Sequence, residues 1–316
     1  MRIVFAGTPA PAIPALEALA ASGHELVGAI SRPDRPSGRG RRPSASPVAQ
    51  AAGAMGLAVL KPNHPRDPDF QEALRQLAPD AVAVVAYGAL LPESALAITP
   101  LGWINLHFSL LPAWRGAAPV QRSIWAGDEF TGATTFQIVK ELDAGPVFGV
   151  VTYRVPAGAT SGRVFQDLAA AGARLLVTTM DLIESGEARP RPQSSEGISY
   201  APKVTVAEAE VDWSAPPAAV GRQIRACTPA PGAWTTFRGQ RLKLGPVGPD
   251  VEAAGRRGPV GSVIALKRDV LVLTGGGPVR LGQVAPAGKS WMDAAAWARG
   301  LRIDGGRDDN WERFGR

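Results

Sequence analysis

Residues 2–30 of the chain read RIVFAGTPAPAIPALEALAASGHELVGAI, and their pattern predicts the fold class. It opens with a short, nearly continuous apolar run, which is typical of a strand buried on both faces of a parallel sheet. Residues 11–21 follow with helical spacing, with Ile13, Leu16 and Leu19 on one face. Residues 25–30 then predict a second buried strand. A strand, a helix and a strand in this order predict a βαβ unit with parallel strands.

The same alternation continues through the first half of the chain. We predict helices over residues 46–55 and 68–77, and strands over residues 57–60 and 81–86, the last with the sequence AVAVVA. Short connections between such elements predict an α/β fold with a doubly wound, mostly parallel, Rossmann-like sheet. A long amphipathic helix is predicted over residues 161–186. Ligands of such sheets lie outside the carboxyl ends of the strands, so the segments that follow those ends are expected to converge on one cleft.

The composition changes after that helix. Residues 188–203, ARPRPQSSEGISYAPK, are rich in Pro and Ser and lack periodicity, which predicts a linker. Beyond it, short β-like runs such as residues 258–265 and 269–273 alternate with Gly and Pro, as in a small β-barrel. The polar C-terminal stretch, RGLRIDGGRDDNWERFGR, is expected to fray. The predicted parts are a first domain, a linker and a C-terminal β-barrel of the OB-like kind, at residues 1–188, 189–204 and 205–316.

Basic residues gather in two places. The chain has 34 Lys and Arg against 28 Asp and Glu, a net charge of +6. Residues 32–42, an expected loop of sequence RPDRPSGRGRR, hold five Arg and one Asp, and residues 222–243 hold four Arg and one Lys with no acid. A high-GC genome also enriches Arg, so composition alone leaves two explanations open. The clustering favours a polyanionic partner.

Several classes of protein are disfavoured by what the sequence lacks. No stretch approaches the roughly 18–20 apolar residues of a membrane helix, and the N-terminus does not resemble a signal peptide. Cys227 is the single cysteine, which gives no disulfide framework. The turn after the first strand lacks G-x-G-x-x-G, and there is no Walker motif, so neither NAD nor ATP is expected. We expect a cytoplasmic protein that does not bind membranes and is by default a monomer.

The residues whose side chains are most suited to catalysis lie in one loop. Residues 103–119 read WINLHFSLLPAWRGAAP, and Leu142-Asp143-Ala144-Gly145 follows the next predicted strand. Asn105 and His107 are two positions apart on a short predicted strand, so both side chains project to one face. An amide and an imidazole aimed at one point, with a carboxylate to follow, indicate a reactive site.

Elimination narrows the chemistry of this loop. Ser109 has apolar neighbours and no nucleophile-elbow context, which favours a turn hydroxyl. A zinc site built on His107 and Asp143 would need further ligands, and the other two histidines lie in expected surface segments, so no metal is predicted. An Asn amide can donate to a developing oxyanion, and a His beside a carboxylate can be cationic or can shuttle a proton. This combination suits acyl transfer to an amine. The alternative is that Asn105 and His107 only satisfy buried backbone groups.

The pattern N-x-H-x-S-L-L-P-x-x-R-G-A-A-P with a downstream L-D-x-G resembles the formyltetrahydrofolate-dependent formyltransferases. The resemblance extends over nearly the whole chain. It includes FAGTP near the N-terminus, PDRPSGRGRR in the basic loop, VVAYGALLP after the strand at 81–86, and VDW at residues 211–213.

The resemblance implies a reaction and three catalytic residues. The formyl group of 10-formyltetrahydrofolate would pass to the amino group of methionine carried on the initiator tRNA. Asn105 and a protonated His107 would stabilise the oxyanion, and Asp143 would hold His107 and move the proton through water. The C-terminal barrel would add a basic face for the tRNA helix.

The resemblance also implies binding residues. The folate would lie against two segments, Val85, Ala86, Tyr87, Gly88, Leu90, Leu91 and Pro92, and Ser109, Leu110, Leu111 and Pro112. The predicted tRNA contacts are Arg35, Arg39, Arg41, Arg42 and Arg115.

Other acceptors use the same core in the family. Enzymes that formylate purine precursors usually lack a C-terminal extension, and those that oxidise formyltetrahydrofolate carry a long dehydrogenase module. Enzymes that formylate nucleotide-linked amino sugars are the closer alternative, although they have no need of an Arg-rich loop. A non-catalytic RNA-binding protein is an alternative of another class, which charge alone supports.

Overall fold

The computed structural model describes residues 1–37, 42–249, 258–303 and 311–315. The chain forms two compact units, which we describe separately. Unit 1 comprises residues 1–119, 130–154 and 165–202, and unit 2 comprises residues 120–129, 155–164 and 203–316.

Unit 1 is built on a seven-stranded sheet of order β5-β2-β1-β6-β7-β8-β9. Neighbouring strands are parallel from β5 to β7, whereas β8 and β9 are antiparallel to their neighbours. The predicted mostly parallel sheet is therefore confirmed. The strand bounds are β1 Arg2–Gly7, β2 Glu25–Ile30, β5 Val59–Leu60, β6 Ala81–Val85, β7 Trp103–His107, β8 Phe130–Gln137 and β9 Val147–Arg154.

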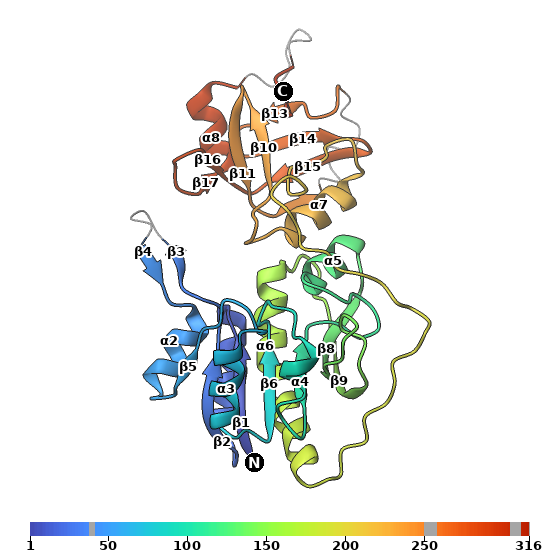
Figure 1. Ribbon diagram of the computed structural model, residues 1–316. Helices are drawn as coiled ribbons and strands as arrows, with labels where there is room; N and C mark the ends of the chain where they lie inside the picture. Colours follow the sequence, from blue (N-terminus) through green and yellow to red (C-terminus); the bar gives the residue numbers. More distant parts are fainter. Residues whose placement is uncertain (38–41, 250–257, 304–310, 316) are drawn as a thin grey trace. The chain divides into compact units, whose positions relative to one another are not determined.

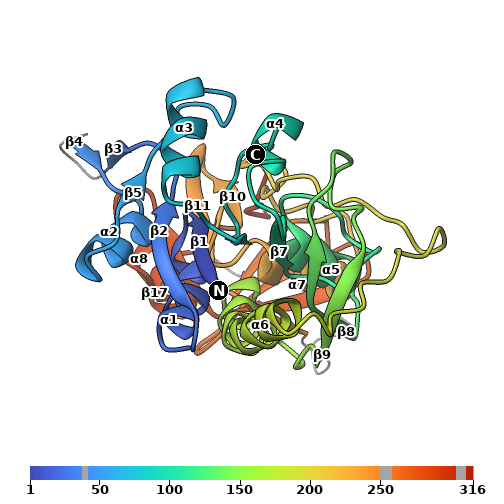
Figure 2. The ribbon, with the colours of Figure 1, turned by 60° about the horizontal axis from the view of Figure 1, so that its bottom comes forward.

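Helices cover both faces of this sheet. Figure 2 shows α3 and α4 on one side and α1 and α6 on the other. The bounds are η1 Ala10–Ala12 (a 3-10 turn), α1 Ile13–Ala20, α2 Pro47–Ala54, α3 Pro68–Gln76, α4 Glu93–Leu96 and α6 Ser161–Glu184. Among the described residues, no helix combines the length and apolar character needed to cross a bilayer.

The core explains why these strands occupy the centre of the sheet. Val4 of β1 and Val82 of β6 pair in register and are completely buried, and Phe70 and Leu74 of α3 pack in the same apolar cluster. A strand covered by helices on both faces needs apolar residues throughout, which the sequences of β1 and β6 provide.

The carboxyl ends of β1 and β6 meet as expected. The Thr8 hydroxyl, just after β1, donates a hydrogen bond of 2.8 Å to the carbonyl oxygen of Tyr87, just after β6. The segments that follow these two strands therefore converge at one edge of the sheet.

Part of the predicted basic loop forms a hairpin. Strands β3 (Arg35–Ser37) and β4 (Arg42–Ser44) pair antiparallel, with Pro36 opposite Pro43. Figure 1 shows the two strands beside α2, apart from the main sheet. Sequence analysis predicts a loop here, because Pro and Gly interrupt the alternation on which strand prediction depends.

Unit 2 contains two four-stranded sheets, of order β10-β11-β16-β17 and β12-β15-β14-β13, and all their pairings are antiparallel. This confirms a small C-terminal β domain. Its strands are β10 Trp234–Phe237, β11 Gln240–Leu244, β12 Val247–Pro249, β13 Val263–Ala265, β14 Val270–Thr274, β15 Gly277–Leu281, β16 Gln283–Pro286 and β17 Met292–Asp293. Its helices are α7 Pro217–Ala226, α8 Ala294–Leu301 and most of α5 Pro119–Ala126.

The predicted fraying of the C-terminal stretch is wrong where the structure describes it. Phe314 is only 4% exposed and lies 5.3 Å from the Trp213 ring and 5.5 Å from the Phe237 ring, measured between centroids. Its backbone N–H donates to the carbonyl oxygen of Gly261 at 2.9 Å. Burial of the Phe314 ring therefore orders this segment although its neighbours in sequence are polar.

Candidate active site

Strand β7 carries the two residues at the centre of the predicted site. Asn105 lies opposite Phe136 of β8, and His107 lies opposite Thr134. The His107 ring meets Phe136 edge-on, with centroids 6.4 Å apart. Since residues opposite each other share a face of the sheet, this contact agrees with Asn105 and His107 on one face. No hydrogen bond joins the Asn105 side chain to another described residue, so its amide is available to a ligand.

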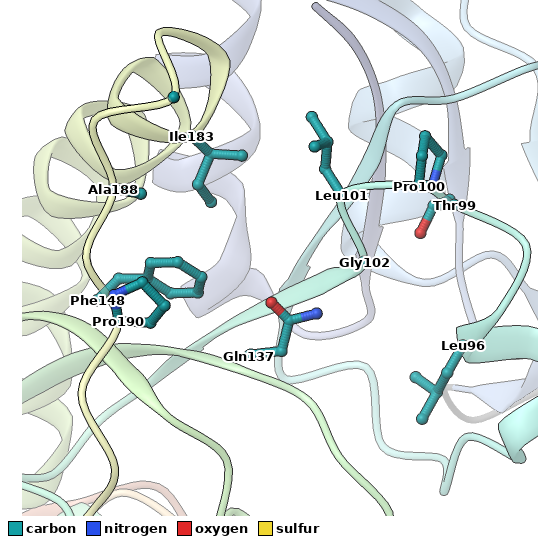
Figure 3. A pocket seen from close by; sticks show the side chains of 11 residues that line it. Leu96, Thr99, Pro100, Leu101, Gly102, Gln137, Phe148, Ile183, Ala188 and Pro190 are labelled. Carbon is teal, nitrogen blue, oxygen red and sulfur yellow. The ribbon is translucent and has the colours of Figure 1, made fainter.

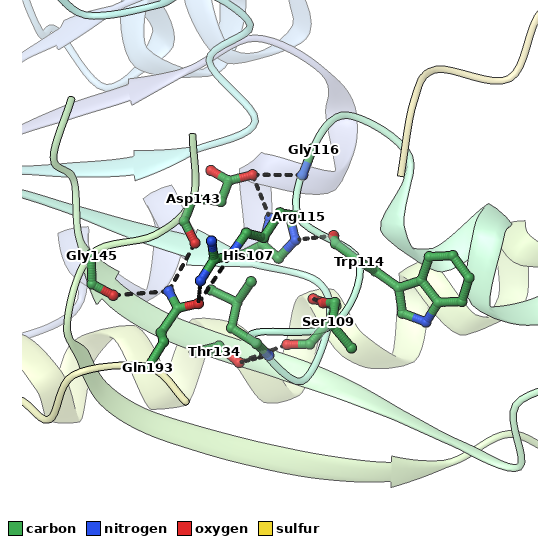
Figure 4. A network of polar contacts seen from close by, with 11 residues as sticks. His107, Ser109, Trp114, Arg115, Gly116, Thr134, Asp143, Gly145 and Gln193 are labelled. Atoms are coloured by element: carbon green, nitrogen blue, oxygen red, sulfur yellow. Dashed lines mark hydrogen bonds and ion pairs between the residues drawn. The ribbon is translucent and has the colours of Figure 1, made fainter. Parts of the chain in front are cut away.

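His107 is held from one side. Its Nε2 lies 2.8 Å from the carbonyl oxygen of Trp114 (Figure 4). A carbonyl only accepts hydrogen bonds, so Nε2 carries the proton. The other ring nitrogen, Nδ1, faces Asp143 Oδ2 at 3.8 Å. This distance exceeds that of a direct hydrogen bond and leaves room for a bridging group.

Burial disfavours the charged form of the His107 imidazole. Burial lowers the pKa of His107, and it outweighs the Asp143 carboxylate and the Trp114 carbonyl, which both raise that pKa. The expectation of a protonated His107 concerns the stage at which the oxyanion forms, and it stays a prediction. In the neutral ring with Nε2–H, the Nδ1 atom is a proton acceptor that faces the Asp143 carboxylate.

Asp143 is held at its side chain and its backbone. The Gly116 N–H donates to Asp143 Oδ2 at 2.7 Å. The Gln193 amide nitrogen donates to the carbonyl oxygens of Asp143 and Gly145, at 2.8 and 2.9 Å. Arg115 in turn donates to Gln193 Oε1 from Nε at 3.1 Å and from Nη2 at 2.7 Å. Gln193 was missed because one amide in a Pro/Ser-rich segment matches no motif.

Strained backbone marks three loops at this edge. Ala86 after β6, Trp114 after β7 and Asp143 after β8 all have left-handed backbone, with φ of 49°, 61° and 49°. Such conformations are uncommon for residues other than Gly and persist where the surroundings fix them, often at functional sites.

The first predicted folate segment combines buried and accessible residues. Val85 and Tyr87 are buried, whereas Gly88 is exposed and Leu90 is 78% exposed. Gly88 also has a positive φ of 78°. The remaining members, Ala86, Leu91 and Pro92, are exposed or half-buried.

Ser109, the first residue of the second predicted folate segment, has a structural role. Ser109 is fully buried, and its hydroxyl donates to the carbonyl oxygen of Ala113 at 2.6 Å, as a turn hydroxyl would. The Thr134 hydroxyl donates to the Ser109 carbonyl oxygen at 2.6 Å. Folate contact by Ser109 therefore has no support in this geometry. Leu110, Leu111 and Pro112 are half-buried and keep some accessible surface.

The predicted tRNA contacts fall into two groups. Arg35 is exposed at the start of β3 and makes no ion pair with a described residue. Arg39 and Arg41 lie outside the described residues, and of Arg42 only the backbone, at the start of β4, is described. Arg115 differs, because its side chain is buried, with 9% exposure, and is bound to Gln193.

The second basic cluster also divides. Arg222 and Arg225 are half-buried on α7. Arg238, Arg241 and Lys243 are exposed, although Arg238 forms an ion pair with a carboxylate of the C-terminal segment. Arg241 and Lys243 alternate with buried residues on β11 and so share its outer face.

A pocket of about 440 Å³ lies away from these residues (Figure 3). Gly102 before β7 and Gln137 at the end of β8 line it, so it opens near the start of β7, whereas His107 ends that strand. None of its lining residues is a predicted site residue. Within the described part of the chain, no group of three or more His, Cys, Asp or Glu side chains is arranged to hold a metal.

A His–Asp pair 3.8 Å apart, beside an Asn amide with no hydrogen-bond partner among the described residues, lies at the carboxyl edge of a Rossmann-like sheet and carries the groups that acyl transfer needs. The family profile described as Formyl transferase matches residues 1–180, and that described as Formyl transferase, C-terminal domain matches residues 203–302. The chain belongs to the formyl transferase family and is an enzyme that transfers a one-carbon formyl group.

Relatives of high identity share one name. The chain is 61% identical to the methionyl-tRNA formyltransferase of a Nocardioides species, over 97% of each chain. It is 59% identical to the methionyl-tRNA formyltransferase of Thermobifida fusca, over 100% of this chain and 99% of the relative.

More distant solved structures share the fold. HypX from Aquifex aeolicus, in complex with tetrahydrofolic acid, has a TM-score of 0.66 at 20% identity, covering 94% of this chain but only 47% of that one. An N-formyltransferase from Helicobacter canadensis, in complex with folinic acid and dTDP-3-aminofucose, has a TM-score of 0.66 at 14% identity, covering 88% of this chain and 97% of that one.

Proposed function

We propose that this enzyme transfers the formyl group of 10-formyltetrahydrofolate to the free amino group of methionine esterified to initiator tRNA. The observation that carries the choice of acceptor is the 61% identity to a methionyl-tRNA formyltransferase along almost the entire chain. The fold does not decide the acceptor, since a solved neighbour bound to an amino-sugar nucleotide shares it. An amino sugar is therefore the less favoured acceptor.

The donor would bind along residues 85–92, beside Leu110, Leu111 and Pro112. The exposed Gly88 and Leu90 offer backbone and apolar surface there. Bound 10-formyltetrahydrofolate would supply the activated formyl group. In the transfer, a bond forms between the methionine nitrogen and the formyl carbon, and the bond from that carbon to the folate nitrogen breaks.

His107 and Asp143 would manage the proton. The attacking nitrogen must lose a proton and the departing folate nitrogen must gain one. The neutral Nδ1 of His107 and the Asp143 carboxylate are both acceptors, 3.8 Å apart, so an amine with two N–H groups can donate to both. His107 would accept the proton as the amine attacks. The imidazolium formed next to Asp143 would then be stabilised by the carboxylate until it delivers the proton.

Asn105 would stabilise the negative charge that develops on the formyl oxygen. Its amide has no partner among the described residues and shares a face of β7 with His107. A prepositioned donor of this kind is worth about 2.7–4 kcal/mol in other acyl-transfer sites.

The acceptor tRNA would be bound by cations outside the reaction centre. Arg35 on β3, together with Arg39, Arg41 and Arg42 of the basic segment, would contact phosphates near the acceptor end. Arg241 and Lys243 on the outer face of β11 would extend that contact in unit 2. Such contacts position the RNA through charge and shape more than through base identity.

The remaining predictions concern the state of the enzyme. We expect a monomer that acts in the cytoplasm, where charged tRNA and folate are both present. We also keep the domain limits of 1–188, 189–204 and 205–316 as working boundaries for truncation.

The test is a direct assay of acceptors. The enzyme is incubated with 10-formyltetrahydrofolate and methionyl initiator tRNA, and in parallel with an amino-sugar nucleotide. Formyl-methionyl-tRNA is the expected product. If the sugar were formylated and no formyl-methionyl-tRNA formed, the amino sugar would be the acceptor instead. No product with either would reject both.

A further inference from the structure

Three consecutive residues of the loop after β7 serve the His–Asp pair. The Trp114 carbonyl oxygen binds His107 Nε2 at 2.8 Å, and the Gly116 N–H binds Asp143 Oδ2 at 2.7 Å. Arg115, between them, directs its guanidinium to Gln193 (Figure 4). We call residues 114–116 the catalytic strap. The strap holds both members of the pair, and Gln193 links it to the backbone of the Asp143 loop.

Gln193 has a demanding pattern of bonds. Its oxygen accepts from Arg115 Nε and Nη2, and its nitrogen donates to the carbonyl oxygens of Asp143 and Gly145. An amide can do this because it joins an acceptor and two donors in one plane. Neither a carboxylate nor an apolar side chain can make both sets of bonds.

The Asp143 loop needs such a support. The backbone of Asp143 is left-handed, with φ of 49°, which costs about 1–3 kcal/mol unless the surroundings impose it. Two residues later, Gly145 passes so close to the Gln137 carbonyl oxygen that a Cβ built there would collide with it. Gln193 binds the carbonyl of the strained residue and that of the crowded one.

The strap is itself held by the segment that contains Gln193. The Trp114 N–H donates to Ser199 Oγ and the Arg115 N–H to the Ser199 carbonyl oxygen, both at 2.9 Å. The Ala201 N–H donates to the Arg115 carbonyl oxygen at 2.7 Å. Residues 193–201, which the sequence presents as linker, therefore brace the site from outside.

We propose that Gln193, held by Arg115, is a positioning residue that keeps the Asp143 carboxylate opposite His107 Nδ1. The proposal rests on the proposed function in that His107 and Asp143 are taken as the proton-transfer pair. It also assigns Arg115 to the support of the site, where the sequence predicts an RNA contact. The buried guanidinium of Arg115 is bound to Gln193, whereas the exposed Arg35 makes no ion pair with a residue that the structure describes.

Two substitutions separate the bonds of Gln193. Gln193→Ala removes all of them and leaves Arg115 without this partner. Gln193→Glu keeps an acceptor for Arg115 but cannot donate to the two carbonyls. We expect both variants to lower kcat by about tenfold to a hundredfold, as loss of near-ångström alignment does, with KM for tRNA changed less than about twofold. Gln76→Ala on the exposed end of α3 is the matched control and should leave kcat unchanged.

A second measurement does not need the reaction. The chain has three histidines, so the His107 imidazole can be followed by NMR across a pH titration of the full chain and identified by its loss in His107→Ala. The Asp143 carboxylate raises the pKa of His107. Displacement of Asp143 in Gln193→Ala, which adds no charge, should therefore move the His107 titration to lower pH, which a role in stability alone would not do.

The outcomes are distinct. A lower titration midpoint in Gln193→Ala, together with a lower kcat in both variants, supports the proposal. Full activity in Gln193→Glu would overturn it, since Gln193 would then serve only as a partner for Arg115. An unchanged titration midpoint would also overturn it. If kcat fell together with the melting temperature while the midpoint stayed the same, Gln193 would act on stability alone. If the unmodified enzyme formylates no methionyl-tRNA, the proposed function fails, while the titration still decides whether Gln193 positions Asp143.

Discussion

Two arginine-bearing segments follow strands of the same sheet and differ in almost every physical respect. Arg115, after β7, is 9% exposed and is bound to Gln193. Arg35, after β2, is exposed and makes no ion pair with a described residue. The first guanidinium is committed to the protein, whereas the donors of the second remain available to an external anion.

From this contrast in burial we infer which step of the reaction each segment affects. Hydrogen bonds of a buried charged group contribute about 1.5–3 kcal/mol and hold neighbouring groups in one geometry. An exposed charge contributes little to stability and is screened by salt. We therefore expect changes around the strap to alter kcat, and changes on the hairpin to alter tRNA binding and its salt dependence.

The largest effect should come from His107→Ala. Without the imidazole, no group at this position accepts the proton from the attacking amine, so kcat should fall by about 10³-fold, equivalent to about 4 kcal/mol. The affinity for tRNA should change little, since His107 is buried and the exposed cations remain. Single-turnover kinetics and filter binding measure the two quantities separately.

His107→Asn serves as a partner variant, since it keeps a polar group for the Trp114 carbonyl. If either variant weakened tRNA binding as much as it slowed the reaction, His107 would be a structural residue, and the contrast between strap and hairpin would lose its basis.

Asp143→Asn should have the next largest effect. Burial lowers the pKa of His107, so protonation inactivates the base only as the pH falls below about 6.5, and kcat should decline there. Removal of the Asp143 charge removes a cause that raises this pKa. The acid limb of kcat should then move to still lower pH, with a plateau lowered about 10²-fold. The amine substrate is the same in both profiles, so a shift of the limb reports on the enzyme. An unshifted limb would separate Asp143 from His107.

Gly145→Ala should disturb the Asp143 loop, which the strap contacts, through packing alone. A Cβ would collide with the Gln137 carbonyl oxygen, and overpacking of this kind costs about 2 kcal/mol. Gly53→Ala is the matched control, because Gly53 is exposed on α2, has nothing within 4 Å of its would-be Cβ, and should gain helix propensity. Urea unfolding compares them. Equal stabilities would mean that the loop can move away from Gln137 at no cost.

The fold followed from the sequence wherever a local pattern was sufficient. The buried strands at residues 2–7 and 81–86 are read from apolar runs, because a strand covered on both faces can contain little else. Their convergence at the carboxyl edge follows from topology. The hairpin β3–β4 could not be found in this way, since its Pro36–Pro43 pairing has no periodic signal.

The site was predictable as a set of chemical groups but not as a geometry. Asn105, His107 and Asp143 stand out by residue type and spacing. The direction in which the pKa of His107 is shifted depends on burial, which no local sequence pattern reports. The role of Gln193 depends on a contact with Asp143, 50 residues away in the chain.

The smallest effect should come from Arg35→Ala on the hairpin. The loss of one phosphate contact should raise KM for tRNA by a fewfold, about 1 kcal/mol, and reduce the slope of log affinity against log salt by about 1. The folding stability, kcat and folate binding should be unchanged, because Arg35 is exposed and has no ion-pair partner among the described residues.

Arg75→Ala is a matched control, since Arg75 is an exposed arginine on α3 whose ion pair with Glu72 is also exposed. If Arg35→Ala and Arg75→Ala had the same salt slope, the hairpin would act only through general charge. A lower slope in Arg35→Ala alone would make β3 part of the tRNA interface, and an accompanying fall in kcat would mean that the hairpin also aligns the acceptor with His107.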